Sequence, residues 1–133
     1  MIKREKTMKT DTKKTYDSAV DNLLVGIGND YENWNSPYAK TDWTKVEKKI
    51  RIESINKFKN TLYVKPGRKF DKVIHGTSVW GFVAKTDGVL KGIPYFVGDV
   101  FKAAGWAAPA KHVRGSIFAT ETNWYAWTGP NYL

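Results

Sequence analysis

The chain has 133 residues, of which 22 are Lys or Arg and 13 are Asp or Glu, so its formal net charge is +9 at pH 7. This length suits one folded domain and not two independent cores. Because the sequence contains no cysteine, disulfide frameworks, thiolate zinc sites and cysteine nucleophiles are excluded. No apolar run approaches the ~20 residues that span a bilayer, and the charged N-terminus does not have the pattern of a signal peptide. We therefore expect an intracellular protein.

The positive charge is concentrated in two segments. Residues 1–15 carry six basic and two acidic residues, and residues 45–72 carry ten basic and three acidic residues. Between them, residues 16–44 hold one basic and five acidic residues. Such segregation favours association with a polyanion and says nothing about the fold. We expect residues 1–15 to be a basic arm, flexible or ordered by a partner, and residues 16–133 to form a single domain.

The first predicted element is a helix over residues 16–27. Apolar side chains recur there at intervals of three and four residues, which is the spacing of one helical face. We expect Gly26 or Gly28 to end this helix, because glycine is common just beyond a helix C-terminus. Residues 29–38 are rich in turn-forming residues and predict a loop.

A second helix is predicted over residues 45–59. Thr44 and Glu47 have the spacing of a capping box, in which the hydroxyl and the carboxylate each accept a hydrogen bond from the other residue's backbone amide. The apolar residues that follow do not form one narrow stripe. Ile50 and Ile52 would also suit the start of a strand, so both interpretations stay open for this segment.

From residue 62 onward the pattern changes to that of strands. Residues 98–105 are an exception and predict one or two helical turns, with Asp99 as the N-cap and Gly105 at the end. The expected fold class is α+β, with N-terminal helices packed on a small antiparallel β-sheet. Strands are expected at residues 62–64, 69–75, 79–84, 116–119 and 124–127.

The sequence was also tested for catalytic and metal-binding patterns. His75 and His112 could serve as general base and general acid on a phosphodiester, with Lys111 and Arg114 stabilising the developing charge. This would make the protein a histidine-dependent nuclease; the alternative is that the two histidines have no shared role. No clustered metal-ligand pattern, phosphate-binding loop or dinucleotide fingerprint is present, so we expect no metal and no cofactor.

The basic residues of the middle segment are the main candidates for a binding surface. Lysines on exposed helix faces are often only solvated, but a cluster of this size could follow a phosphate backbone. We call this set the basic stripe, and it consists of Lys45, Lys48, Lys49, Arg51, Lys57, Lys59, Lys65, Arg68, Lys69 and Lys72.

The sequence has 19 aromatic residues, and most of them must be core in a domain of this size. Trp80 and Phe82 alternate along one expected strand, which indicates that both face the core from one side of the sheet. Aromatic side chains that lie beside Lys or Arg can stack on nucleobases. The candidates for such contacts fall in loops or at element ends and are Trp34, Trp43 and Trp106.

Residues 62–133 resemble a family of small proteins from tailed phages. In that family a short hairpin is followed by a G-D-x-x-K-x-A-x-W turn, an A-P-A-K-x-x-R-G-x-I loop and a Tyr-Leu end. Here these motifs are residues 98–106, residues 108–117 and Tyr132-Leu133. Residues 85–97 look like an insertion relative to that family, and Ser116 stands where the pattern has Asn. The resemblance implies a phage context and no particular activity.

Residues 109–115 predict a loop. Pro109 at its start fixes one backbone φ angle, and Gly115 at its end permits a positive φ angle. Between them lie three side chains that can carry positive charge: Lys111, His112 and Arg114. One interpretation is a loop packed under the sheet. The other is a loop that faces an anion.

Three hypotheses follow from the sequence. The first is a non-enzymatic phage protein that binds DNA or RNA through the basic stripe and the 109–115 loop. The second is a virion or assembly protein whose residues 1–15 lie on neighbouring subunits or on packaged DNA. The third is the histidine-dependent nuclease. The expected location is the host cytoplasm or, for the second hypothesis, the virion; no membrane partner is expected.

Overall fold

The computed structural model describes residues 10–38, 42–121 and 123–131. Two helices, α1 (Thr10–Trp34) and α2 (Lys45–Asn60), precede all of the strands in this part of the chain. The prediction of an α+β fold with N-terminal helices is confirmed. The strands are β1 (Leu62–Lys65), β2 (Phe70–His75), β3 (Ser78–Ala84), β4 (Gly88–Leu90), β5 (Ile93–Tyr95), β6 (Asp99–Ala103), β7 (Pro109–Ser116), β8 (Tyr125–Ala126) and β9 (Gly129–Pro130).

The main sheet has five antiparallel strands in the order β1-β2-β3-β6-β7. Two short hairpins, β4–β5 and β8–β9, lie outside it. One row of cross-strand neighbours runs from Lys65 on β1 through Lys72 and Phe82 to Phe101 on β6. Side chains directly opposite each other in an antiparallel pair point to the same face, so these four share one face of the sheet.

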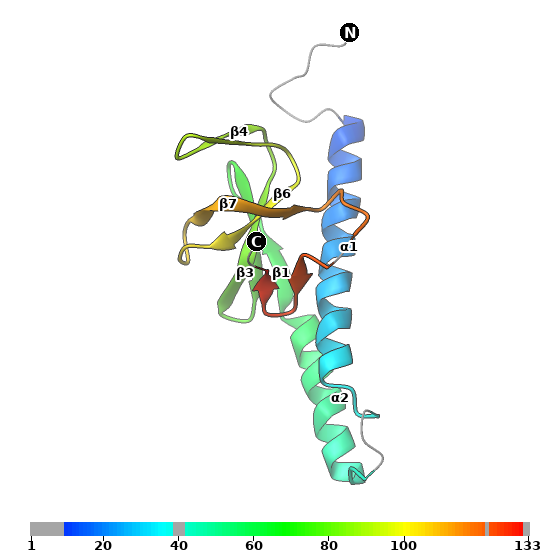
Figure 1. Ribbon diagram of the computed structural model, residues 1–133. Helices are drawn as coiled ribbons and strands as arrows, with labels where there is room; N and C mark the ends of the chain where they lie inside the picture. Colours follow the sequence, from blue (N-terminus) through cyan, green and yellow to red (C-terminus); the bar gives the residue numbers. More distant parts are fainter. Residues whose placement is uncertain (1–9, 39–41, 122, 132–133) are drawn as a thin grey trace.

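The helix α1 covers the other face of the sheet (Figure 1). Its buried residues Tyr16, Val20, Leu23 and Ile27 pack in one cluster with Val73, Trp80, Val83 and Val100 of the sheet. The β8–β9 hairpin closes this cluster, because the indole N–H of Trp80 donates to the carbonyl of Ala126 at 2.9 Å.

The β4–β5 hairpin covers part of the face that points away from α1. Tyr95 of this hairpin is buried with Phe82, Ala84 and Phe101, and Phe70 packs against the same cluster. The hairpin lies within residues 85–97, the segment expected to be an insertion, so that segment contributes to the core.

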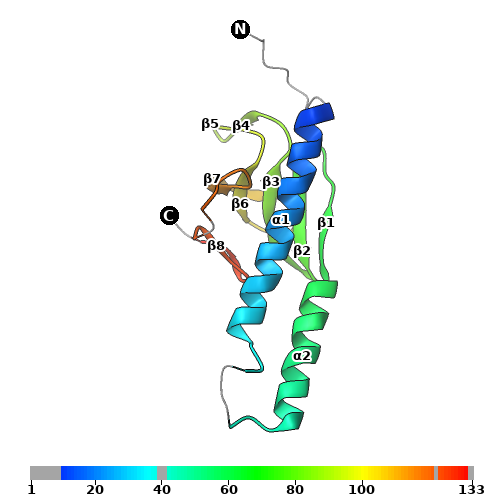
Figure 2. The same cartoon turned by 90° about the vertical axis from the view of Figure 1, so that its right-hand side faces the viewer.

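The helix α2 extends beyond the sheet and packs against the C-terminal part of α1 (Figure 2). Phe58 of α2 stacks on Tyr31 of α1, with ring centroids 4.1 Å apart. The capping box at Thr44 and Glu47 is confirmed, because both of its hydrogen bonds are present. The alternative interpretation of residues 50–52 as a strand is wrong, since α2 continues through them.

The prediction that α1 ends at Gly26 or Gly28 is wrong. The helix starts at Thr10 and runs to Trp34, so it includes the last residues of the expected arm and half of the expected loop. The two glycines allow close approach instead of ending the helix. A Cβ on Gly26 would lie 2.0 Å from the Tyr125 hydroxyl, and a Cβ on Gly28 would lie 3.2 Å from Cγ of Lys59.

Three other local predictions are wrong. Within residues 98–105, Asp99–Ala103 form strand β6 and not a helical turn, because Val100 and Phe101 alternate between the two buried faces of the sheet. Residues 109–115 belong to strand β7, which pairs with β6, and are not a loop. The closing strand expected at residues 116–119 is absent: residues 117 and 118 form a turn.

Trp80 and Phe82 are both buried, as expected of core residues, but they face opposite sides of the sheet. The register between β2 and β3 shifts after Val73, so that Val73 pairs with Gly81 and Ile74 pairs with Val79. Trp80 is the extra residue of this bulge, and an extra residue reverses the alternation of side chains beyond it. Trp80 therefore packs under α1, while Phe82 packs under the β4–β5 hairpin.

Candidate functional site

The strongest candidate for a functional site is a hollow on the sheet face that points away from α1. It has a volume of about 440 Å³ and lies between the β1–β2 turn and the β6–β7 turn. The β6–β7 turn, yellow in Figure 1, is on the side of the sheet opposite α1. We call this hollow the sheet groove, and it is lined by Lys65, Pro66, Gly67, Arg68, Lys69, Phe70, Lys72, Phe82, Trp106, Ala107 and Pro109.

Four members of the basic stripe meet in the sheet groove. Lys65 and Lys72 are cross-strand neighbours, and Arg68 and Lys69 belong to the turn that joins β1 and β2. Like charges directly opposite each other in a sheet repel. The repulsion between Lys65 and Lys72 would fall on binding an anion, because the anion would neutralise both ammonium groups.

Trp106 is the one of the three candidate aromatic residues that the sheet groove includes. The Trp106 side chain is 51% exposed, and the ammonium group of Lys72 lies 4.3 Å from the centre of its ring. Lys72 also lies 5.8 Å from the ring of Phe82. An ammonium group over an aromatic face is attracted by the ring's electrons. This contact positions the indole beside the cations.

A buried carboxylate holds the β1–β2 turn in place. Asp71 accepts hydrogen bonds from the Tyr16 hydroxyl at 2.8 Å and from the ammonium group of Lys85 at 3.0 Å. It also accepts from the backbone amide of Gly67, whose carbonyl accepts a second bond from Lys85. Burial, together with the charge of Asp71, raises the pKa of Tyr16 above its ordinary value, so the phenol stays a donor. The network connects α1 to the turn that carries Arg68 and Lys69.

The outer half of α2 carries a second group of basic residues, which we call the α2 cluster: Lys45, Lys48, Lys49 and Arg51. A helix of about 24 Å and a strand of about 13 Å separate Lys45 from Lys65. The basic stripe is therefore not one continuous surface. Arg51 lies over the ring of Trp43, 3.7 Å from its centre, and Lys49 pairs with Glu53 at 3.9 Å on the exposed helix surface.

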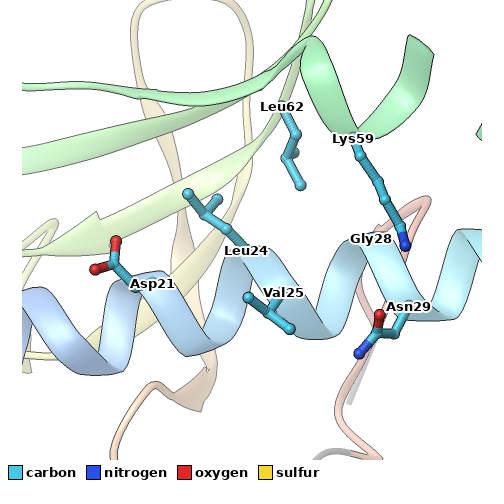
Figure 3. A pocket seen from close by; sticks show the side chains of 7 residues that line it. All are labelled: Asp21, Leu24, Val25, Gly28, Asn29, Lys59 and Leu62. Atoms are coloured by element: carbon cyan, nitrogen blue, oxygen red, sulfur yellow. The ribbon is translucent and has the colours of Figure 1, made fainter. Parts of the chain in front are cut away.

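The last turns of α2 contribute less to an anion site. Lys59 forms an ion pair with Glu32 of α1 and lines a hollow of about 460 Å³ between α1 and the α2–β1 junction. Figure 3 shows Leu24 and Leu62 on the two sides of this hollow and Lys59 over Gly28. The hollow thus has a mixed lining, with Asp21 and Asn29 beside the apolar residues, and its cation already has a carboxylate partner. Lys57 is exposed on α2.

The remaining candidates are dispersed. Lys111 and His112 are exposed on β7, two and three residues beyond Pro109 of the sheet groove, and Arg114 is half-buried on the same strand. Trp34 is 73% exposed at the end of α1. Of the expected arm of residues 1–15, residues 1–9 lie outside the described residues.

The sheet does not bring the two histidines together. His75 ends β2 and packs on Phe58 of α2, with ring centroids 4.1 Å apart, whereas His112 lies on β7. Three strand spacings separate β2 from β7, which amounts to about 14 Å. Burial lowers the pKa of His75. One phosphodiester could not reach both imidazoles in this arrangement.

The structure gives no separate indication of a metal site or a membrane span. In residues 10–38, 42–121 and 123–131, no three His, Cys, Asp or Glu side chains are grouped so that they could hold a metal ion. Over the same residues, no helix combines the length and the apolar character that crossing a membrane requires.

Sequence reasoning missed two contributors to the sheet groove. Phe70 and Phe82 form its apolar wall. Alternation along the expected strand places Phe70 on the same face as Lys72, but only the strand register shows that Phe82 lies beside Lys72. It also missed the role of Asp71, for which the sequence does hold a signal. Asp71 is the only acidic residue between Glu53 and Asp87, and an isolated acid in a basic segment is a candidate for a buried, paired carboxylate.

Comparison with known families gives one match. A model of a family of unknown function, DUF7717, matches residues 3–132. The chain belongs to this family. No curated protein and no solved structure matches it. The family match covers the helices and the sheet together.

Proposed function

We propose that the protein is a non-enzymatic nucleic-acid-binding protein and that its contact surface is the sheet groove. The observation that supports this most is the convergence of four cations and a half-exposed tryptophan on one hollow. Lysine and arginine neutralise phosphates, and an exposed indole can stack on a base. The net charge of +9 would attract a polyanion from a distance, while the groove would give the contact its position.

The phage context implied by the sequence resemblance is part of this proposal. In that context the ligand would be phage or host DNA or RNA, encountered in the host cytoplasm. Lys111 and His112 would extend the contact along β7, because they follow Pro109 at the edge of the groove. The α2 cluster would add attraction at long range only.

The test compares two triple variants with the same change in charge. Lys65→Gln, Arg68→Gln and Lys69→Gln remove three cations of the groove, and the control replaces Lys45, Lys48 and Lys49 with Gln. Binding of labelled single-stranded and duplex oligonucleotides is followed by fluorescence anisotropy over a range of salt concentrations. A plot of the logarithm of the binding constant against the logarithm of the salt concentration has a negative slope. Loss of three phosphate contacts should make this slope shallower by about two to three, and it should reduce the affinity at ~0.1 M salt by about 100-fold.

The control variant should keep both the salt slope and most of the affinity. If the two triple variants lose affinity equally, the net charge and not the groove determines binding. If the unmodified protein binds neither oligonucleotide at low salt, the proposed function is wrong.

A virion or assembly role is the second candidate, and one observation favours it. Among the charged residues of the outer half of α2, Val46 and Ile50 are 66% and 56% exposed, and Tyr38 beyond α1 is 75% exposed. Apolar surface of this kind is typical of contacts between protein subunits. Stoichiometric presence in purified virus particles, together with no binding of free oligonucleotides, would favour this role over the first.

A further inference from the structure

The shape and lining of the sheet groove bear on which form of nucleic acid it accepts. Its volume of about 440 Å³ lies in the range of roughly 300–1,000 Å³ that is typical of small-molecule sites. A hollow of this size can receive a base and its sugar. A duplex would have to lie across its rim, because the helix is far wider than the hollow.

The lining of the groove is partly apolar as well as basic. Phe70, Phe82, Pro66 and Pro109 line it together with the four cations. The outer surface of a duplex consists of phosphates, sugars and polar base edges, which gain little from an apolar wall. A single strand exposes the flat faces of its bases, and these faces gain from burial against apolar and aromatic side chains.

Trp106 supplies the stacking surface. Lys72 lies over its ring, and half of the side chain's surface remains exposed to a ligand. Because Lys72 is held at the indole, a base stacked there would have its own phosphate close to a cation. The base pairs of a duplex already stack on each other, so an unpaired base is needed for this contact.

We propose that the sheet groove binds single-stranded nucleic acid in preference to duplex, with an unpaired base stacked on Trp106 and the flanking phosphates on Lys65, Arg68 and Lys69. This inference rests on the proposed function and specifies its ligand. It assigns different roles to neighbouring side chains: Trp106 selects for unpaired bases, and the three cations hold any phosphate chain.

The experiment uses the full chain and three labelled probes of the same length: a single strand, the same strand annealed to its complement, and a strand with abasic positions. The unmodified protein should bind the single strand about tenfold or more tightly than either of the other probes. Trp106→Ala should reduce affinity for the single strand to that for the abasic strand and should leave affinity for the duplex nearly unchanged. Trp106→Phe should retain part of the preference, which shows that the turn still folds.

Trp34→Ala is the matched control, because Trp34 is also exposed but lies at the end of α1. It should leave all three affinities unchanged. Equal affinity for single strand and duplex, or an equal loss for both in Trp106→Ala, would overturn the inference while leaving nucleic-acid binding in place. If no probe is bound, the proposed function itself is wrong, and this inference is wrong with it.

Discussion

The sheet groove and the α2 cluster each contain four basic residues and a cation over a tryptophan ring, yet they differ in shape and in support. The cations of the groove come from two strands and a turn, and they surround a hollow with an aromatic wall. The cations of the α2 cluster come from one helix, on which Lys45, Lys48 and Lys49 have the spacing of a single outward face. Equal charge therefore lines a hollow in one region and a convex helix surface in the other.

The two regions also differ in what holds them in place. The β1–β2 turn is fixed by the hydrogen bonds of Asp71, which is 7% exposed. The outer half of α2 is stabilised by its capping box. The apolar side chains beside its cations, Val46, Ile50 and Ile52, are exposed and so add little packing. A flexible lysine loses conformational freedom when it binds, so a surface that is already ordered loses less. This comparison predicts that structural changes near the groove will affect binding more than changes in α2.

The largest expected effect follows from removing the carboxylate of Asp71. Asp71→Ala would remove the acceptor shared by Tyr16, Lys85 and the amide of Gly67, and Lys85 would keep only its bond to the Gly67 carbonyl. This change should lower the free energy of unfolding by about 2–4 kcal/mol. It also raises the net charge by one, which by charge alone would strengthen binding of a polyanion. We expect weaker binding instead, because the β1–β2 turn loses its support. Urea denaturation and anisotropy measure the two quantities.

Tyr16→Phe is the control for this variant. It removes one hydrogen bond to Asp71 but leaves those from Lys85 and Gly67, so it should cost about 1 kcal/mol and keep the affinity. If Asp71→Ala bound oligonucleotides more tightly than the unmodified protein, net charge would outweigh the order of the turn. The contrast between the two regions would then be wrong.

A smaller effect is expected at the start of α2. Thr44→Ala removes the side-chain half of the capping box and should lower the free energy of unfolding by about 1 kcal/mol. Because this change loosens the α2 cluster and not the groove, affinity for oligonucleotides should stay within about twofold. Thermal unfolding monitored by circular dichroism, together with anisotropy, would check both points. Thr77→Ala in the exposed β2–β3 connection should change neither quantity.

The fold could be predicted from the sequence where local signals and tertiary contacts agree. The capping box of α2 and the strands over residues 62–84 are examples, because turn residues and apolar alternation mark them directly. The errors arise where a distant segment decides the outcome. The helix α1 continues past Gly26 because Ile27 packs in the core and Tyr31 stacks on Phe58 of α2. Phe101 lies in a strand because β3 and β7 pair with β6 on both sides.

The sequence could identify most residues of the candidate site, but it could not show how they are arranged in space. The sequence identifies Lys65, Arg68, Lys69 and Lys72 as a basic group, and it identifies Trp106 as an aromatic residue outside the core. It cannot show that these five line one hollow, because residues 73–105 separate them and the sheet order brings them together.

The smallest expected effect concerns His75, which lies where α2 meets the sheet and packs on Phe58. Burial lowers its pKa below the ordinary value of 6.5, so below about pH 6.5 the unfolded chain binds a proton that the folded chain does not. The free energy of unfolding should therefore fall as the pH decreases from 7 toward 5. The decrease should be smaller than the one expected for Thr44→Ala, because the imidazole is only partly buried. His75→Phe keeps an aromatic ring against Phe58 and should weaken this pH dependence, which urea denaturation at several pH values measures. His112→Gln is the control: His112 is exposed, so this variant should keep the pH dependence of the unmodified protein. An unchanged pH dependence in His75→Phe would mean that the contact between α2 and the sheet is insensitive to this proton.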